Sequence, residues 1–265
     1  SAARFYCFHP FVCEPLVKPR SWGALSAALL VLSLLAGCAG GPVPAVEPMP
    51  SALAAWSGRD IPGKQPTRYS YAQRGGEGCV LAQASRSVSL WRRSLHLPTE
   101  QIDALQFDWW ISGHEAGASV TQADTDDAPA RLLLGFEGDE ARLSVRNRLQ
   151  FELARTLTGE APPYATLMYV WDASAPPETV VVSTRSDRIR KIVVGSGRKT
   201  SGRWQRLRRD VQADYRRAFG EAPGRLITMA MMTDGDNTAS RAEACYGNIL
   251  LLGPDGRLLD GSLQH

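Results

Sequence analysis

The residues best suited to chemistry form a loop near the C-terminal end of the sequence. A run of small and thioether residues at 229–232 leads into Asp234, Asp236 and Asn237. Oxygen atoms this close together on a tight turn could bind Ca²⁺ or accept hydrogen bonds from sugar hydroxyls. Asp and Asn also bond to nearby backbone amides in turns, so a purely structural turn is the alternative. We predict that these three residues bind a ligand, with Asp234 and Asp236 as the metal ligands if the ligand is an ion.

A second group of candidates is aromatic. Trp109 and Trp110 are adjacent, so on a strand their rings point to opposite faces of the sheet. At least one of them lies outside the core unless a helix or loop covers it. Tyr169 and Trp171 are two residues apart and share a face. Exposed rings could stack on sugars, whereas packing in the core is the alternative. We predict Trp109, Tyr169 and Trp171 as ligand-binding residues.

A third group is basic. Residues 185–217 contain twelve Arg or Lys residues and three Asp residues. Such a surface could bind an anionic glycan or lipid head groups such as those of lipopolysaccharide. A solvated face balanced by acidic residues elsewhere in the fold is the alternative. Arg190, which lies on an expected strand, is the candidate ligand-binding residue of this group.

The sequence lacks the common catalytic motifs. It contains no His-Glu-x-x-His zinc motif, no Gly-x-Ser-x-Gly turn, no glycine-rich phosphate loop and no Cys-x-x-Cys pair. His96 and His114 have no neighbour in the sequence that would complete a nucleophilic triad. Asp108, Glu115 and the two loop aspartates are the candidates for paired carboxylates that cleave glycosidic bonds. We predict no catalytic residue and keep such an enzyme as the alternative function.

Short alternating segments dominate the body of the sequence. Residues 145–157 carry an apolar residue at every fourth position and stop before Gly159, and residues 211–219 stop before Gly220, so both are expected helices. We predict an all-β fold with two short helices, of the β-sandwich or jelly-roll class. The expected strands are residues 88–91, 105–109, 130–136, 166–171, 179–184, 189–194, 226–232 and 246–252.

The N-terminal segment has the pattern of a bacterial lipoprotein signal peptide. Lys18 and Arg20 precede an apolar run at residues 22–36, which is shorter than a relaxed membrane span. Small residues then lead into Cys38, whose thiol would accept a diacylglyceryl group. Two or three acyl chains at this position would hold the mature protein on a bilayer. Membrane attachment through this lipid is therefore expected.

This assignment divides the sequence into three parts. Residues 1–37 would be upstream residues plus the signal peptide, residues 38–55 a flexible lipid-anchored spacer, and residues 56–265 a single β-sandwich domain. The first part holds three basic residues and one acidic residue. Its removal lowers the formal net charge from +3 to about +1, which gives no reason to expect a nucleic-acid partner.

The cysteines and the residue after the lipid site indicate the compartment. Two of the five cysteines precede Cys38, which leaves Cys79 and Cys245 in the body. In an oxidising periplasm these two could form a disulfide, and two separate buried thiols are the alternative. Ala39 rather than Asp follows Cys38, which in a Gram-negative host favours transport to the outer membrane. We expect an outer-membrane lipoprotein that faces the periplasm.

Several blocks of the sequence, in their order and spacing, resemble the secreted bacterial family called domain of unknown function 3047. The resemblance covers roughly residues 91–252 and departs from the expected pattern at Gly235 and Asn248, where Thr and Asp would be expected. It implies an extracytoplasmic setting and an architecture similar to jelly-roll carbohydrate-binding modules, and it implies no reaction. The blocks are Tyr-Val-Trp at 169–171, Ile-Val-Val-Gly-Ser-Gly at 192–197, Trp204, Arg-Asp-Val at 209–211, Asp-Tyr at 214–215, Phe-Gly at 219–220, Met-Met-Thr-Asp-Gly-Asp-Asn-Thr at 231–238 and Tyr-Gly-Asn-Ile at 246–249.

These features together predict a lipid-anchored envelope protein that binds a glycan or another cell-envelope polymer without catalysis. The alternative is an enzyme that cleaves glycosidic bonds with paired carboxylates on a jelly-roll scaffold. A third interpretation is an outer-membrane protein that uses its basic residues against lipopolysaccharide.

Overall fold

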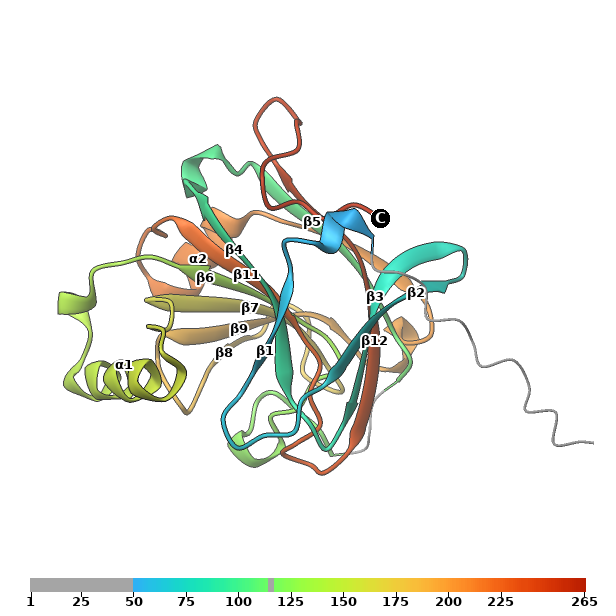
Figure 1. The fold of residues 1–265 in the computed structure, drawn as a ribbon, viewed down its shortest axis with the longest axis horizontal. Coiled ribbons are helices and arrows are strands. Elements are labelled where there is room, and N and C mark those ends of the chain that lie inside the picture. The colour runs from blue at the N-terminus through green and yellow to red at the C-terminus, as the bar shows by residue number, and fades with distance from the viewer. Residues whose placement is uncertain (1–49, 114–116) are drawn as a thin grey trace, which may run out of the picture. The chain divides into compact units, whose positions relative to one another are not determined.

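The computed structural model describes residues 50–113 and 117–265, which are coloured in Figure 1. The expected signal peptide and Cys38 lie outside the described residues. Within the unit Val46–His265, two β-sheets face each other across one apolar core.

The first sheet has seven strands in the order β1-β4-β11-β6-β7-β9-β8. Its neighbouring strands pair antiparallel, except that β7 and β9 run parallel. The strands are β1 (Ser57–Asp60), β4 (Ser89–Leu97), β6 (Arg131–Phe136), β7 (Ala165–Asp172), β8 (Val180–Val182), β9 (Ile189–Ser196) and β11 (Leu226–Met232).

The second sheet has five strands in the order β10-β5-β12-β3-β2, and all of its pairs are antiparallel. Figure 1 shows β2, β3 and β12 of this sheet side by side. The strands are β2 (Arg68–Arg74), β3 (Glu77–Ser85), β5 (Ala104–Ile111), β10 (Trp204–Arg209) and β12 (Arg241–Leu252).

The core forms because alternate residues of each strand point between the sheets. β5 and β7 supply its aromatic centre with Phe107, Trp109, Tyr169 and Trp171. The ring of Phe107 contacts Trp109 edge-on, with centroids 5.2 Å apart, and stacks on Tyr169 at 5.6 Å. Contacts of this kind add to the gain from burial and tie the five-stranded sheet to the seven-stranded one.

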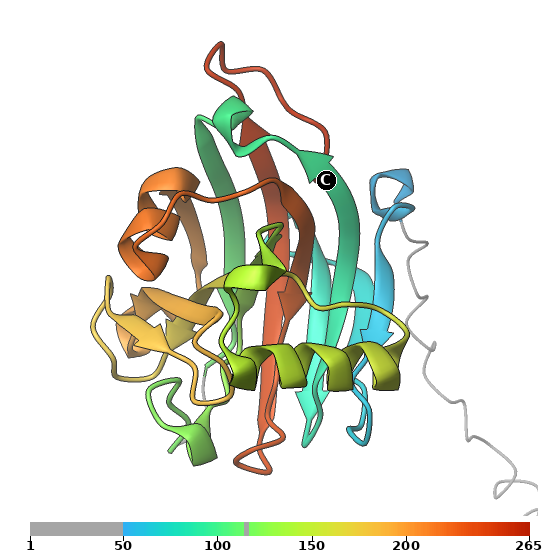
Figure 2. The same ribbon diagram turned by 90° about the vertical axis from the view of Figure 1, so that its left-hand side faces the viewer.

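The first helix, α1 (Val145–Thr158), lies outside the sheets and crosses the front of the molecule in Figure 2. Ser144 caps its first turn by accepting a hydrogen bond from the Asn147 amide (3.2 Å). Gly159 ends it in the left-handed conformation at φ 75°, which glycine adopts without strain. Phe151 is buried beneath the helix, whereas its apolar residues at every fourth position face the solvent.

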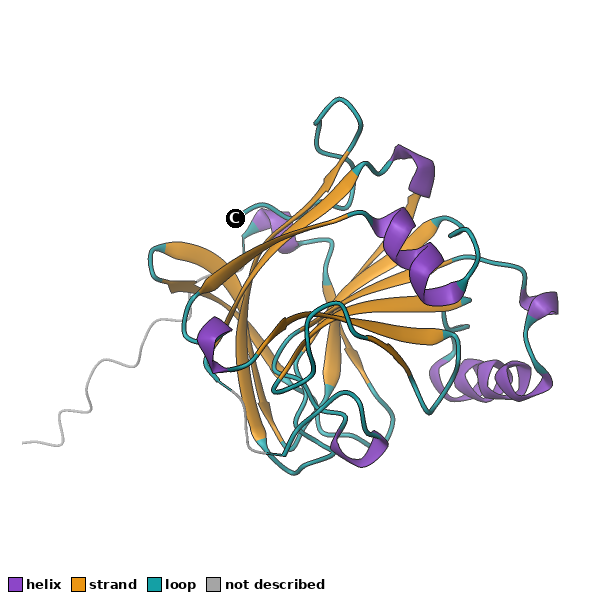
Figure 3. Cartoon of the chain, turned by 180° about the vertical axis from the view of Figure 1, so that it is seen from behind, coloured by secondary structure: helices purple, strands orange, loops and turns teal. Residues whose placement is uncertain are grey.

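The second helix, α2 (Val211–Phe219), covers an end of the core. Asp210 caps it by accepting a hydrogen bond from the Ala213 amide (2.9 Å), and Gly220 ends it in the left-handed conformation. Its Tyr215 ring packs edge-on against Phe136 of β6, with centroids 4.8 Å apart. Figure 3 shows both helices outside the strands. In the part of the chain that the structure describes, no helix is long and apolar enough to cross a bilayer.

The fold class predicted from the sequence is confirmed: the domain is an all-β sandwich of jelly-roll type with two short helices. All eight expected strands are present, whereas β1, β2, β3 and β10 were not expected. Cys79 of β3 and Cys245 of β12 form a disulfide, with Cα atoms 5.5 Å apart. The five 3₁₀ turns of the described residues are η1 (Ser51–Leu53), η2 (Thr99–Gln101), η3 (Ala123–Thr125), η4 (Glu140–Arg142) and η5 (Arg198–Thr200).

The domain begins earlier in the chain than predicted. Leu53, in η1, is buried in the core together with Trp56. The last residues of the expected spacer, 51–55, therefore belong to the folded body. An apolar side chain anchors them there, which the small and proline-rich composition of this stretch did not indicate.

Candidate functional site

The three aromatic residues predicted to bind a ligand lie in the core. Trp109, Tyr169 and Trp171 have no exposed surface. The Tyr169 hydroxyl donates to Asp214 (2.9 Å), and the Trp171 indole N–H donates to Thr200 (2.8 Å). The prediction is wrong for these three rings, because a fully buried ring offers no face on which a sugar could stack.

Trp110 is the ring that points outward. β5 alternates between buried and half-buried residues, so Trp109 faces the core and Trp110 faces the outer surface of the five-stranded sheet. Its partner across the strand pair is Trp204 of β10, which is also half-buried. The Arg74 guanidinium carbon lies 3.9 Å from the centroid of Trp110, within the range of a cation–π contact. We call the outer surface of this sheet around Trp110 and Trp204 the Trp110 face.

The Trp110 face is concave. β2 and β10 are opposite edges of the sheet, yet the Trp204 indole N–H donates to the carbonyl oxygen of Arg74 (3.0 Å). Arg206 of β10 likewise donates to both carboxylate oxygens of Glu77, at 2.9 Å each. The two edges can meet only if the sheet curls over its outer surface. Gly247 of β12 leaves room for this, since a Cβ atom there would lie 3.1 Å from the Trp204 ring.

A polar groove of about 310 Å³ opens on this face between β5, β10 and β12. Asp108, Arg206 and Asn248 contribute its polar groups. Burial raises the pKa of the Asp108 carboxyl. The positive charge of Arg206 and a hydrogen bond from Asn248 oppose this rise in pKa, whereas the negative charge of Glu77 adds to it. A carboxylate, an amide and a guanidinium in one groove can exchange hydrogen bonds with adjacent sugar hydroxyls.

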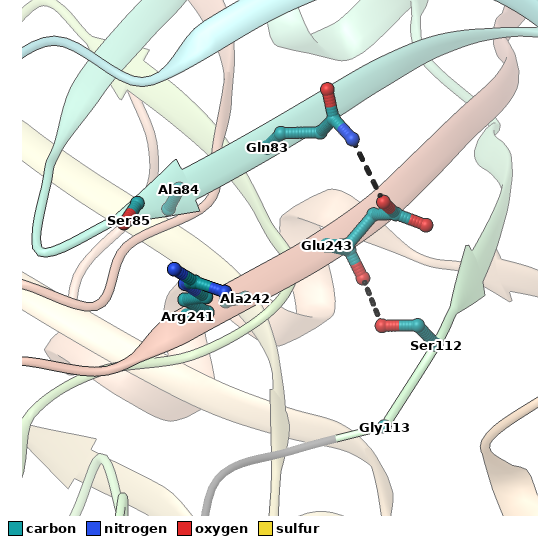
Figure 4. A pocket seen from close by; sticks show the side chains of 8 residues that line it. All are labelled: Gln83, Ala84, Ser85, Ser112, Gly113, Arg241, Ala242 and Glu243. Carbon is teal, nitrogen blue, oxygen red and sulfur yellow. Dashed lines mark hydrogen bonds between the residues drawn. The ribbon is translucent and has the colours of Figure 1, made fainter. Parts of the chain in front are cut away.

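A second groove, of about 440 Å³, lies at the other end of the same sheet, between β3, β12 and the end of β5 (Figure 4). Glu243 projects into it and accepts hydrogen bonds from Gln83 (3.0 Å) and Arg74 (2.8 Å). Ser112 borders the groove and donates to the carbonyl oxygen of Glu243 (3.3 Å). Arg74 therefore contacts both Glu243 and Trp110, and it lies between the two grooves.

The loop that holds Asp234, Asp236 and Asn237 is closed rather than open. Asp234, two residues after β11, is 3% exposed and forms a two-point ion pair with Arg131 of β6, with both N–O distances 3.0 Å. Its carboxylate also accepts a hydrogen bond from the Ala128 amide (2.9 Å). Burial raises the pKa of Asp234 to about 6, although Arg131 acts in the opposite direction.

The other loop residues are also bound by the protein. Asp236 pairs with Lys64 (2.6 Å), and Asn237 donates from its side chain to a backbone carbonyl (2.9 Å). Asp127 accepts hydrogen bonds from the amides of Asn237 (3.1 Å) and Thr238 (2.6 Å) and from the Thr238 hydroxyl (2.6 Å). These contacts correspond to the structural turn that the sequence left as an alternative.

The loop does bring carboxylates together. Asp127, Asp234 and Asp236 each place one oxygen within 4.8 Å of the others, close enough for a metal ion such as Ca²⁺. Arg131 and Lys64 already neutralise two of these carboxylates. A cation would have to replace both contacts, so the arrangement suits a structural network better than a calcium site.

A cavity of about 90 Å³ lies beside this network on the outer surface of the seven-stranded sheet. Lys191 of β9 is buried there and contacts Asp126, which also pairs with Arg131 (3.1 Å). Burial lowers the pKa of the Lys191 amine, and the nearby Arg131 adds to that shift. Among the described residues that line the cavity none is aromatic, so this cavity offers no ring on which a sugar could stack.

The sequence profile of the family described as "Protein of unknown function (DUF3047)" matches residues 54–250, which include both sheets and both helices. The chain belongs to the DUF3047 family. The match confirms the resemblance seen in the sequence. The matched region contains the residues that line both grooves of the Trp110 face. No curated protein sequence matches this DUF3047 protein.

Three xylanase structures are among the solved structures similar to this DUF3047 protein. A double-cysteine mutant of ENZbleach xylanase is 9% identical, with a TM-score of 0.38, and the similarity covers 77% of this chain and 90% of that one. The family 11 xylanase from Neocallimastix patriciarum is 12% identical, with a TM-score of 0.31 and coverage of 73% and 97%. Another double-cysteine ENZbleach mutant is 10% identical, with a TM-score of 0.35 and coverage of 79% and 90%. Similarity at this level assigns no function to the DUF3047 protein.

Half of the basic residues in the segment 185–217 of this DUF3047 protein are neutralised by ion pairs. Arg190, the predicted ligand-binding residue, donates to the carbonyl oxygen of Asp187 (2.8 Å) and lies 5.6 Å from the Phe219 ring. The segment therefore fits the alternative of a solvated face balanced by acidic residues. Six of its twelve basic residues form ion pairs with acidic residues: Arg188, Lys191, Arg206, Arg208, Arg209 and Arg217.

Sequence reasoning missed Trp204, Arg74 and Arg131 as site residues. The alternation around Trp110 showed that one adjacent tryptophan leaves the core, but not which one. Trp204 begins a strand that was hidden in a basic stretch, and its partners come from strands more than 90 positions away in the sequence. Glu115, a candidate carboxylate, and His114 lie outside the described residues.

Proposed function

We propose that this protein is a lipid-anchored cell-envelope module that binds a polysaccharide on its Trp110 face. The observation that supports this most directly is the pair of half-buried rings, Trp110 and Trp204, on a concave face between two polar grooves. Ligand sites commonly combine an apolar or aromatic surface with a few convergent polar groups. Two polar grooves at separate points of one face suit an extended polymer better than a compact metabolite.

The chemistry of the face fits a sugar chain. The Trp204 ring is held by its bond to Arg74 and by its contact with Gly247, so binding costs little side-chain ordering. Asp108 and Asn248 would then bond to hydroxyl groups of the sugar that stacks beside them. Glu243 would do the same in the second groove.

The setting is proposed from the sequence. Cys38 would carry the lipid, and the signal-peptide pattern with Ala39 after it supports an outer-membrane lipoprotein facing the periplasm. The disulfide between Cys79 and Cys245 fits an oxidising compartment. Lipopolysaccharide is the less favoured ligand, because half of the basic segment is occupied by ion pairs within the protein.

The test is binding of the purified protein to a panel of bacterial-envelope and plant polysaccharides. Affinity electrophoresis and tryptophan fluorescence measure the binding. Trp110→Ala should weaken binding about tenfold, as expected for an aromatic residue at the centre of an interface. Trp110→Phe keeps a ring and should retain most of the affinity. Equal binding by the wild type and Trp110→Ala, or no binding to any polysaccharide, would refute the proposal.

A glycoside-cleaving enzyme is the second candidate, and Asp108 is the observation that favours it. Its carboxyl lies in a groove, its pKa is raised by burial, and Glu77 is a neighbouring carboxylate. A general acid needs such a raised pKa. Glu77, however, is held at two points by Arg206, which weakens it as a nucleophile or base. Release of reducing ends by the wild type but not by Asp108→Asn would favour the enzyme over the binding module.

A further inference from the structure

Helix α1 carries an apolar stripe that its own fold does not cover. Four aliphatic side chains recur at every fourth position and are between 59% and 67% exposed: Val145, Leu149, Leu153 and Leu157. Only two other large hydrophobic side chains of the described residues, Val182 and Leu258, belong to the exposed class. An apolar stripe about 18 Å long, at 1.5 Å per residue, is unusual on a monomer surface and marks an interaction site.

The helix is held on its opposite side, so the stripe cannot simply turn inward. Asn147 and Phe151 are buried against the body of the protein. The Asn147 side chain bonds to Asp187 (2.5 Å) and to Ser186 (3.0 Å), and Gln150 donates to the carbonyl oxygen of Arg185 (2.7 Å). The stripe is therefore presented to the surroundings by a rigid element.

Basic residues gather at the first half of the stripe. Arg146 and Arg148 lie in the first turns of α1, and residues 141–151 contain no acidic residue. Both arginines are exposed, and neither forms an ion pair within the described residues, whereas Arg142, just before the helix, pairs with Glu221 (3.5 Å). Further along, Arg155 pairs with Glu152 (2.6 Å), so the excess of positive charge is confined to the N-terminal turns. Aliphatic residues on one side with arginines beside them are typical of a helix that lies in the interface of an anionic bilayer.

The position of α1 also suits a bilayer. Its C-terminal end is tied to the first strand of the domain, because Arg59 of β1 donates to the carbonyl oxygen of Thr158 (3.0 Å) and pairs with Glu160 (3.2 Å). The described chain begins at Pro50, only nine positions before Arg59. The twelve positions from Cys38 to Pro50 span at most about 40 Å when extended. A lipid on Cys38 would thus hold the domain within reach of the same membrane.

We propose that α1 is a second membrane contact, whose apolar stripe enters the interface of an anionic phospholipid bilayer. The inference rests on the proposed lipid anchor for its biological setting, and it goes beyond polysaccharide binding. Two attachments, lipid and helix, would fix the orientation of the domain on the membrane. A single flexible tether would leave that orientation free.

The experiment uses the chain from Ala39 onward, which keeps the whole unit Val46–His265 and carries no lipid. Its co-sedimentation is measured with vesicles of phosphatidylethanolamine and phosphatidylglycerol. Leu149→Gln combined with Leu153→Gln keeps helix propensity and removes the centre of the stripe. This variant should bind at least about tenfold more weakly. The matched control, Val182→Gln with Leu258→Gln, changes two exposed aliphatic residues elsewhere and should bind as the wild type does.

Thermal unfolding should be the same for both double variants, because the altered side chains are exposed. The proposal is overturned if the wild type leaves the vesicles unbound, or if the stripe variant binds them equally well. It is also overturned if sedimentation shows a dimer that only the stripe variant loses, since a second copy would then cover the stripe. Polysaccharide binding by the stripe variant should be unchanged, so a failure here is separate from a failure of the Trp110 face.

Discussion

Replacing Arg131 by Met should destabilise the protein in a way that depends on pH. Arg131 is 2% exposed and makes a two-point ion pair with Asp234, which is 3% exposed. Methionine retains the aliphatic stem but leaves the Asp234 carboxylate buried without its cation. Removal of one partner of a buried pair typically costs about 3–5 kcal/mol. We expect a loss of that size in the free energy of unfolding at about pH 8.

The pH dependence follows from the carboxyl group that remains. With Arg131 present, burial already raises the pKa of Asp234 to about 6. Without Arg131 the folded-state pKa rises further, while the unfolded-state pKa stays near its ordinary value. The folded protein then binds its proton more tightly than the unfolded chain does, so the cost of the buried charge is present at high pH and disappears as the pH falls below the folded pKa. The difference between variant and wild type should therefore shrink towards about pH 5.5.

Denaturant unfolding at these two pH values measures the effect. Arg257→Met is the matched control, because Arg257 pairs with Asp255 (3.5 Å) on the surface and should cost less than about 1 kcal/mol. Arg131→Met combined with Asp234→Leu removes both charges and should recover much of the stability. A loss below about 1 kcal/mol at high pH, or an equal loss at both pH values, would refute the assignment of this pair as a buried structural contact.

Three further predictions concern other contacts. Replacing Cys79 and Cys245 together by Ser should lower the free energy of unfolding by about 2–4 kcal/mol, and the wild type treated with a reductant should lose a similar amount; an unchanged melting temperature would contradict this. Asp127→Ala removes the acceptor of three hydrogen bonds and should make the following loop more sensitive to limited proteolysis, whereas equal cleavage would mean that other contacts hold the loop. Tyr169→Phe leaves Asp214 without one donor and should cost about 1–2 kcal/mol in thermal unfolding, with no effect on polysaccharide binding because the ring is buried.

Local patterns were sufficient for most of the fold. The glycines at 159 and 220 end helices because both positions require a left-handed backbone. A single glycine in the sequence is enough to indicate that requirement. The adjacent tryptophans in β5 predicted rings on opposite faces, which the structure confirms. Period-2 alternation does not say which face is the core, however, so Trp109 was chosen as the exposed ring where Trp110 holds that position.

The candidate site depends on long-range pairing, and this is why the sequence showed only part of it. Asp234 and Arg131 are 103 positions apart, and Trp204 and Arg74 are 130 apart. A carboxylate in a turn has the same appearance in the sequence whether it binds calcium, a sugar or a buried arginine. The apolar spacing of α1 predicted the helix correctly, but an amphipathic pattern alone does not tell whether the partner of its apolar stripe is the core of the same chain or something outside it.

The disulfide of β3 and β12 bears on how the protein is made. Its two cysteines are 166 positions apart, so in the proposed exported lipoprotein nearly the whole domain has to cross the inner membrane before the bond can close. The sequence contains five cysteines, of which three lie at or before the proposed lipid site. In the proposed mature lipoprotein Cys38 is acylated, so Cys79 and Cys245 are the two thiols that remain. Oxidation within one molecule can then form only the disulfide between Cys79 and Cys245. Maturation would therefore not require a disulfide isomerase to correct mispaired intermediates.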